Sequence, residues 1–218
     1  MMGNKETNHF ENAQWIFVKD IPEDVCNTYF EYETVFSVEN RENVRLFISA
    51  STLYAVSVNG VFVDCGQYAD YEDYQVYDTL DISGLVRPGK NTLKIDHYVI
   101  GTNYFTHRIQ IPGIIFAVWE KDRCVLDSDE KVLSRKNAHY QDGPMEHISG
   151  QLGYVFKYDA CAGELPWQKS VLAGKEKHLF ERPIKKLIIE KETTGNLKTQ
   201  GVYVTDGKEK SVGKKVYT

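Results

Sequence analysis

Apolar and polar residues alternate along several short stretches of the chain, which is the pattern of half-buried β-strands. The stretch YFEYETVFSV, residues 29–38, predicts one shared strand face made of Phe30, Tyr32, Thr34, Phe36 and Val38. The stretch NVRLFISAS, residues 43–51, repeats the pattern with Val44, Leu46 and Ile48. No long segment places apolar residues at i, i+3, i+4 and i+7, so the helical period is missing.

Turn signals separate these runs. In LYAVSVNGVFVDCG, residues 53–66, Asn59-Gly60 joins two alternating runs, and this dipeptide suits the two positive-φ positions of a type I′ hairpin turn. Further strands are expected at the following places: 92–99 after the turn Pro88-Gly89, a hairpin from GIIFAVWE and RCVLDS around 120–122, LGYVFKYDA at 152–160, IKKLIIEKE at 184–192 and GVYVTDG at 201–207. Many short strands without helices between them predict an all-β, antiparallel sandwich.

The domain organisation follows from this pattern. We expect a flexible N-terminus at 1–12, a β-sandwich at 13–161 and a connecting loop at 162–182, which contains Gly163, Pro166 and Gly174. Residues 183–218 hold two or three strands, too few to bury a core. These extra C-terminal strands either return to the sandwich or begin a following β module.

Composition and charge narrow the class of partner. The 218 residues are 42% hydrophobic and 26% charged, with a net charge of −5, so nucleic acid is not an expected partner of the chain. Residues 185–218 carry eight lysines and four acids, a net of +4, which leaves −9 for residues 1–184. Lysines alternate with strand-like residues there, so we interpret the basic tail as solvated surface.

The N-terminus, the hydropathy and the cysteines together predict the cellular location. The opening MMGNKETNHF has no apolar run, and no stretch approaches the roughly 20 apolar residues of a membrane span. Cys26, Cys65, Cys124 and Cys161 form no Cys-x-x-Cys pair. We therefore expect a cytoplasmic protein with reduced cysteines and no membrane partner.

A tyrosine recurs at every third residue in YADYEDYQVYDTLDIS, at positions 68, 71, 74 and 77. This period fits neither a strand nor a helix. Three interpretations are open: rings that pack over the edge of the sandwich, rings such as Tyr71 and Tyr74 that stack on a sugar, and a calcium loop that uses Asp70, Glu72, Asp73 and Asp78. The glycine and spacing of an EF-hand are absent, which argues against the third.

The stretch VIGTNYFTHRIQIPG, residues 99–113, follows a strand, lacks alternation and gathers amide, aromatic, imidazole and guanidinium groups. Loops on a rigid scaffold often carry binding groups, and these groups suit sugar hydroxyls and rings. The candidate ligand-binding residues are Asn103, Tyr104, His107 and Arg108. The alternative is a loop whose aromatic rings plug the end of the sandwich while Arg108 pairs with an acid.

The sequence contains no motif typical of catalysis or of metal binding. Glu72, Asp73, Asp78 and Asp81 supply carboxylates, but neighbouring acids in a surface crossing are usually only solvated. The six histidines show no metal spacing, and His97, in an apolar strand, is expected to be a hydrogen-bonded core residue. There is no Gly-x-Ser-x-Gly elbow and no phosphate-binding loop. We expect no catalytic residue, metal or cofactor in this chain.

One combination of motifs resembles a known family. The Asn59-Gly60 hairpin, the tyrosine-rich crossing and DISGLVRPGKNTLKI at 81–95 are similar to the galactose-binding-like jelly-roll domains of large glycoside hydrolases. The order of further motifs resembles the N-terminal β-sandwich of bacterial α-L-rhamnosidases: AQWIF at 13–17, EHISGQLGYVFKYDA at 146–160, LPWQKSVLAG at 165–174 and ERPIKKL at 181–187. β-Galactosidase-type enzymes carry a similar hairpin and Pro-Gly-x-Asn segment.

The resemblance implies a non-catalytic module. Rhamnosidases hydrolyse their substrate in an (α/α)₆ barrel, and nothing in this sequence resembles one, so no acid is carried over. The implied partners are a downstream catalytic domain of the same polypeptide and, through weak contact, rhamnose-containing glycans. The alternatives are a stand-alone carbohydrate-binding protein and the sugar-binding-like domain of a β-galactosidase-type enzyme. No motif in the sequence supports the interpretation that these 218 residues are a complete enzyme.

Overall fold

The computed structural model describes residues 8–189, apart from 23, 69, 72, 73, 150, 175 and 176, and the backbone of two later strands. These residues form strands, turns and loops, and no helix, which confirms the all-β prediction. The strands are β1(Ile16–Phe17), β2(Thr28–Val38), β3(Val44–Ala50), β4(Leu53–Val58), β5(Val61–Gly66), β6(Gln75–Asp81), β7(Gly89–Val99), β8(Ile114–Glu120), β9(Arg123–Asp127), β10(Leu133–Lys136), β11(His147–Ser149), β12(Gly153–Tyr154), β13(Gln168–Lys169), β14(Val171–Leu172), β15(Leu179–Glu181), β16(Val202–Val204) and β17(Lys214–Val216).

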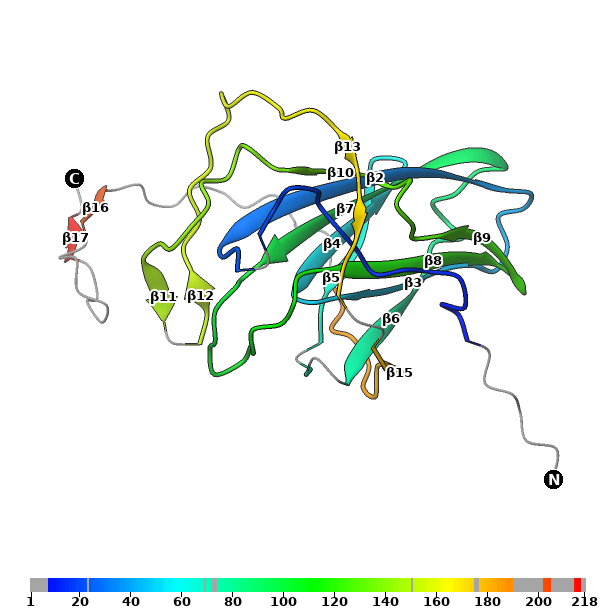
Figure 1. Ribbon diagram of the computed structural model, residues 1–218, viewed down its shortest axis with the longest axis horizontal. Helices are drawn as coiled ribbons and strands as arrows, with labels where there is room; N and C mark the ends of the chain where they lie inside the picture. Colours follow the sequence, from blue (N-terminus) through cyan, green and yellow to red (C-terminus); the bar gives the residue numbers. More distant parts are fainter. Residues whose placement is uncertain are drawn as a thin grey trace.

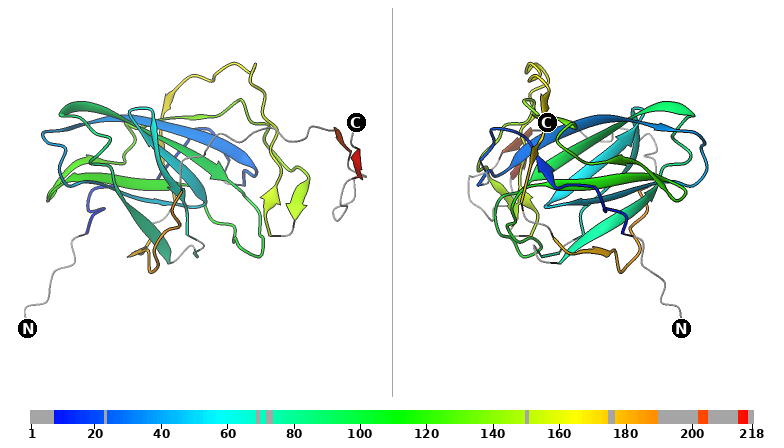
Figure 2. Two further views of the ribbon diagram at one scale, coloured as in Figure 1. Left: turned by 180° about the vertical axis from the view of Figure 1, so that it is seen from behind. Right: turned by 45° about the vertical axis from the view of Figure 1, so that its right-hand side comes forward.

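Two sheets form the body of the molecule and lie over one another as two layers (Figures 1 and 2). Sheet A has the order β14-β1-β8-β3-β6-β15, with β9 beside β8, and sheet B has the order β13-β10-β2-β7-β4-β5. Taken alone, the first eight strands run β1-β8-β3-β6 in one layer and β2-β7-β4-β5 in the other. This interleaved order is that of a jelly-roll sandwich, as the sequence predicts.

The longest ladder shows how the alternating pattern produces the layers. β2 and β7 pair over eleven positions, from Thr28↔Val99 to Val38↔Gly89. Four of the five side chains predicted for one face of β2 are buried, namely Phe30, Tyr32, Phe36 and Val38. Thr34 is half-buried. The period of two therefore assigns this strand's inner face correctly.

The β4–β5 hairpin forms because of its turn residues. Asn59 has φ = 52° and Gly60 has φ = 78°, the two positive values that a type I′ turn requires. The turn also fixes a neighbour, since the Asn59 side-chain oxygen accepts a hydrogen bond from the Thr92 amide at 3.0 Å. The sequence-predicted hairpin is thus present and is bound to β7.

The main core lies between the two sheets. It consists of the inward side chains of both layers, and its largest fully buried members include Phe30, Tyr32, Leu46, Ile48, Leu93, Ile95, Ile114 and Phe116. Each such side chain contributes about 1.5–3 kcal/mol through removal from water. A core of this size makes the sandwich a stable frame for the loops at its ends.

A second apolar cluster covers the outer face of sheet A. Phe10, Trp15, Phe47, Ile115 and Ala117 are buried together there. The cluster joins the N-terminal arm to the sheet, because the His9 ring stacks on Phe47 with ring centres 3.8 Å apart. Phe10 belongs to the stretch 1–12 that the sequence predicts to be flexible, and residues 1–7 lie outside the described residues.

Short strands occupy the segment predicted to be a connecting loop. β13 pairs with β10, β14 with β1, and β15 with β6, so this segment lines one edge of sheet B and both edges of sheet A. The β15–β6 pair is parallel, an exception in a sandwich whose other strand pairs are antiparallel in the described residues. Strands of two or three residues leave no alternation in the sequence, which explains the difference from the prediction.

The last predicted strands differ from their expected form. Within LGYVFKYDA only Gly153–Tyr154 is a strand, and it pairs with β11. Residues 184–189 form no strand, and GVYVTDG contains β16, which pairs with β17. The end of IKKLIIEKE, 190–192, lies outside the described residues, and the domain limits stay a prediction.

Candidate functional site

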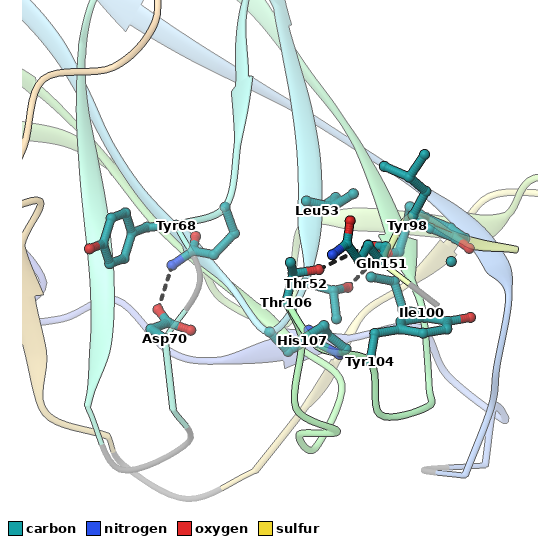
Figure 3. Close-up of a pocket in the computed structure, with 14 residues that line it drawn as sticks. Thr52, Leu53, Tyr68, Asp70, Tyr98, Ile100, Tyr104, Thr106, His107 and Gln151 are labelled. Carbon is teal, nitrogen blue, oxygen red and sulfur yellow. Dashed lines mark hydrogen bonds between the residues drawn. The ribbon is translucent and has the colours of Figure 1, made fainter. Parts of the chain in front are cut away.

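A pocket of about 270 Å³ opens at one end of the sandwich (Figure 3). Four segments meet around it: the β3–β4 turn, the crossing from β5 to β6, the loop from β7 to β8 and the β11–β12 turn. Its size lies near the lower end of the range for small-molecule pockets. The lining combines apolar side chains, such as Leu53 and Ile100, with a few hydroxyl, amide and carboxylate groups.

A buried histidine supports the β3–β4 side of the pocket. His97 Nε2 lies 3.4 Å from the Ser51 hydroxyl and 3.3 Å from the Thr52 hydroxyl. Burial lowers the pKa of His97 to about 3, so its imidazole is neutral at physiological pH. A serine beside a histidine suggests a nucleophile and its base, but His97 Nδ1 has no orienting partner among the described residues, and such an imidazole is a poor base. The cluster is therefore structural, as the sequence predicts for His97.

Asp70 organises the wall that comes from the tyrosine tract. Its carboxylate accepts hydrogen bonds from the Gln67 amide at 2.8 Å, the Val76 backbone at 2.7 Å and the Gln110 amide at 3.2 Å. Burial raises the pKa of Asp70, and these hydrogen bonds partly oppose the increase. Asp70 thus holds the crossing against the pocket, where Tyr68 lies on the same side (Figure 3).

The four tyrosines of the tract have two kinds of environment. Tyr68 and Tyr77 are half-buried, whereas Tyr71 and Tyr74 are 67% and 64% exposed. Tyr71 and Tyr74 pair in an isolated β-bridge, and the Tyr74 ring stacks on Phe180 with ring centres 5.6 Å apart. The expected packing thus applies to Tyr68 and Tyr77 and in part to Tyr74, and the rings of Tyr71 and Tyr74 do not line the pocket.

The loop from β7 to β8 places one ring inside the end of the sandwich. Tyr104 is buried against His147 and Tyr154, with ring centres 5.3 and 6.0 Å away. Burial, with the neighbouring Tyr154 hydroxyl, raises the pKa of Tyr104 to about 12. The Tyr104 amide donates to the His107 carbonyl at 2.9 Å, which closes the loop into a compact turn.

His107 offers the clearest unused polar group. It lines the pocket, and its Nε2 atom is buried without a hydrogen-bond partner among the described residues. Burial also lowers the pKa of His107, so the ring is neutral and has one donor and one acceptor nitrogen. Next to it, the Thr106 hydroxyl donates to the Gln151 carbonyl at 3.1 Å and joins the loop to the β11–β12 turn. A ligand with a hydroxyl group would satisfy the imidazole.

Only some of the predicted binding residues meet. Tyr104 and His107 line the pocket, while Asn103, Arg108, Tyr71 and Tyr74 do not. Asn103 Oδ1 instead accepts a hydrogen bond from the Ile109 amide at 2.8 Å. The Arg108 side chain is exposed and forms no ion pair in the described part of the chain, so the alternative in which it pairs with an acid is not seen there.

Sequence reasoning missed the polar groups that complete the lining. They are Ser51, Thr52, Gln67, Thr106 and Gln151, together with Asp70, which the sequence analysis considered only as a calcium ligand. Each follows or lies within a turn, so a search for polar residues next to strand ends would have included them. Such a search would also have returned many other loop residues, because the pocket joins segments that are far apart along the chain.

Two of the acids considered for catalysis, Asp78 and Asp81, have structural partners. Asp78 is buried and contacts Arg182, Tyr54 and Lys186. Asp81 accepts a hydrogen bond from the Ser83 amide at 2.9 Å, while Glu72 and Asp73 lie outside the described residues. Among the residues that the structure describes, no group of three His, Cys, Asp or Glu side chains is arranged to hold a metal ion. In the same residues there is no helix with the length and hydropathy to cross a membrane.

Comparison with known proteins gives the fold a context. No family model and no curated protein matches the sequence. Among solved structures, the family 78 rhamnosidase of Bacillus sp. GL1 matches with a TM-score of 0.70 at 22% identity, covering 80% of this chain and 20% of that chain. The α-L-rhamnosidase of Aspergillus terreus matches with a TM-score of 0.55 at 16% identity, covering 77% and 22%. That of Streptomyces avermitilis, solved with L-rhamnose, has a TM-score of 0.50 at 17% identity and covers 75% and 14%.

The coverage locates the likeness within those proteins. The chain spans 14% to 22% of the length of these rhamnosidases. Most of the sandwich therefore corresponds to one part of each larger protein. The chain has the fold of a β-sandwich domain found in α-L-rhamnosidases.

Proposed function

We propose that this chain is a non-catalytic β-sandwich module of an α-L-rhamnosidase-like glycoside hydrolase. Its main role is to support a catalytic (α/α)₆ barrel that lies outside these 218 residues. The observation that carries the proposal is the fold match, which includes 80% of this chain but only a fifth of the Bacillus rhamnosidase. At 22% identity the match concerns the fold, so activity and substrate enter as part of the proposal.

The site chemistry supports a non-catalytic role. Glycoside hydrolysis needs two carboxyl groups about 5–10 Å apart, with one free to donate a proton. Asp78 is occupied by Arg182, Tyr54 and Lys186, and Asp70 by Gln67, Val76 and Gln110. Among the described residues that line the pocket, Asp70 is the only acid, so no acid pair is present there.

Weak glycan contact at the pocket is the second part of the proposal. A sugar ring presents hydroxyls at its rim and C–H groups on its faces. The pocket matches both, through His107 Nε2, which has no hydrogen-bond partner among the described residues, and through the apolar walls of Leu53, Ile100 and Leu152. The same contact would suit a stand-alone carbohydrate-binding protein, which is the alternative that the pocket favours.

The first experiment tests catalysis. The purified 218-residue chain is incubated with an aryl α-L-rhamnoside, and release of the chromophore is followed. We expect no release above the buffer rate. Turnover that follows the protein through successive purification steps would contradict a non-catalytic role.

The second experiment tests glycan contact. L-Rhamnose and rhamnose-capped oligosaccharides are titrated into the chain by calorimetry, and we expect a millimolar isotherm. His107→Ala should abolish it, and Tyr71→Ala, which alters an exposed ring outside the pocket, should leave it unchanged. A flat trace for the unmodified chain would remove glycan contact from the proposal and leave the supporting role.

A further inference from the structure

A chain of hydrogen bonds connects the pocket with a lysine on the far side of β6. Lys177, in the link between β14 and β15, donates to Gln75 Oε1 at 3.3 Å. Gln75 Nε2 donates to Gln110 Oε1, and Gln110 Nε2 donates to Asp70 Oδ1 at 3.2 Å. We call these four residues the amide relay. It begins on an ammonium group and ends on a carboxylate that lines the pocket.

The two ends of the amide relay determine how both amides are turned. A lysine ammonium can only donate and an ionised carboxylate can only accept. Gln75 must therefore turn its oxygen toward Lys177, and Gln110 must turn its nitrogen toward Asp70. Both amides are buried, since Gln75 is 0% and Gln110 is 8% exposed. The aligned amide dipoles thus link the positive and the negative end through a region that excludes water.

Backbone pairing and an aromatic ring hold Lys177 at its end of the amide relay. β15 pairs with β6 in parallel, with Leu179 opposite Gln75, and the Gln75 backbone amide donates to the His178 carbonyl at 3.1 Å. The Lys177 ammonium also lies over the Trp15 ring, 4.6 Å from its centre. Its positive charge is therefore fixed relative to the carboxylate, unlike that of a solvated surface lysine.

Asp70 keeps one acceptor position for a ligand. Its Oδ2 atom accepts hydrogen bonds from the Gln67 side chain and the Val76 backbone, and its Oδ1 atom accepts one from Gln110. A carboxylate offers about four acceptor positions. Within the described part of the chain, Oδ1 can therefore take one further hydrogen bond, and a ligand hydroxyl in the pocket is a suitable donor.

Asp70 also dominates the charge of the pocket. It is the only Asp, Glu, Lys or Arg among the described residues that line the pocket, and His107 is neutral because burial lowers its pKa. Burial raises the pKa of Asp70, while its hydrogen-bond donors and the positive charge of Lys177 oppose the increase. Glu72 and Asp73, on the same crossing, lie outside the described residues.

We propose that Asp70 makes the pocket specific for uncharged sugars, and that Lys177 is the positioning residue that holds the Asp70 carboxylate in place as an anion. Oδ1 accepts a hydrogen bond from a ring hydroxyl, and the negative charge repels the carboxylate of a uronic acid. This inference rests on the glycan contact in the proposed function and adds to it a selection between neutral and acidic sugars.

Carbon-13 NMR titration of the Asp70 carboxyl group tests the amide relay without a ligand. The unmodified 218-residue chain is compared with Lys177→Met, which keeps an apolar stem beside Trp15 but removes the charge. We expect a higher pKa for Asp70 in this variant, because the positive end of the amide relay is lost. Lys185→Met, which removes an exposed lysine outside the amide relay, should leave the pKa of Asp70 unchanged. Equal pKa values in Lys177→Met and the unmodified chain would overturn the role of Lys177.

Calorimetry with L-rhamnose tests the role of Asp70 in the pocket. The affinity should weaken as the pH falls through the pKa of Asp70, and in Lys177→Met this weakening should begin at a higher pH. Asp70→Asn should bind at least about 10-fold more weakly at neutral pH, because a hydrogen bond to a charged acceptor is lost. It should also lose that part of the pH dependence, whereas any contribution from protonation of His107 remains. D-Galacturonate should show no binding to the unmodified chain.

The outcomes separate this inference from the proposed function. Equal affinity of Asp70→Asn and the unmodified chain for L-rhamnose, or D-galacturonate that binds as tightly as L-rhamnose, would overturn the specificity and leave the glycan contact standing. An unmodified chain that binds no L-rhamnose would remove the glycan contact and the specificity together. The NMR titration of Asp70 would then still decide whether the amide relay acts as proposed.

Discussion

His97 shows how one buried residue shapes both the core and the pocket. It is fully buried on β7, among Phe17, Phe30 and Tyr32, and its Nε2 atom faces the two hydroxyls beneath the pocket. No charged group faces it among these neighbours. Its protonation would place an unpaired positive charge in an apolar layer, which is why its pKa is low.

This environment predicts a pH dependence of stability. The unfolded histidine binds a proton near pH 6.5, whereas the folded pKa is about 3. Between these values the unfolded state binds more protons, so the free energy of unfolding should fall as the pH is lowered, by up to about 1.4 kcal/mol per pH unit from this group. His97→Gln should flatten this slope in denaturant titrations at pH 7, 6, 5 and 4.

The exposed His178 provides the control. His178→Gln should keep the slope of the unmodified chain, because its side chain lies at the surface. Equal slopes in the His97→Gln variant and the unmodified chain would show that His97 is protonated in the folded state.

Asp78 is the second residue with a measurable role. Burial alone would raise the pKa of Asp78, but hydrogen bonds from Arg182 and Tyr54 and the charge of Lys186 hold it below its ordinary value. Asp78→Asn should cost about 2–3 kcal/mol in urea unfolding, because charge-assisted hydrogen bonds in a buried site are lost. Trypsin should then cut faster after Lys186. Unchanged cleavage would show that Asp78 does not hold this segment.

At the scale of elements, turns and alternating runs were predictable and short edge strands were not. Asn59-Gly60 predicted a hairpin because few dipeptides adopt two positive φ values, and the alternation of β2 predicted its buried face. β13, β14 and β15 have two or three residues each, and their pairing depends on edges that form only after the sandwich has assembled. Their positions could not be derived from local pattern.

Gly101 sets the path of the loop that lines the pocket. It has φ = 67°, and a Cβ atom there would lie 2.1 Å from the Val25 carbonyl and 2.5 Å from Cys26 Cα, both backbone atoms. Gly101→Ala should therefore displace the loop and lower the stability by more than the 1–2 kcal/mol of the backbone conformation alone. Thermal unfolding measures this change. Gly84→Ala, where a Cβ has open space, should have a small effect, and similar losses in both variants would contradict the argument.

At the scale of the whole molecule, the family resemblance predicted the fold better than it predicted the site. The pocket joins four segments, and of the predicted binding residues only Tyr104 and His107 reach it. Residue types that suit sugars were recognised in the loop at 99–113, but nothing in the sequence showed that Gln67 and Gln151 lie at the same end of the sandwich. That arrangement depends on pairing between strands that lie far apart in the sequence.

Exposed apolar side chains at the exit of the chain are a second feature of the whole molecule. A sandwich that works alone would cover its large apolar groups, whereas here Leu187 and Ile188 are almost fully exposed at the exit of the chain. The solved rhamnosidases that share the fold are about five times longer than the matched part. Both observations are those expected of the module proposed above.

The central proposal is that this sandwich is one module of a larger rhamnosidase-like hydrolase. The most direct measurement expresses the complete reading frame and assays it with an aryl α-L-rhamnoside beside the 218-residue chain. We predict that the frame continues past Thr218 into a long helical domain, that the complete protein releases the chromophore, and that the short chain does not. A frame without such a domain, or turnover by the short chain alone, would contradict the claim.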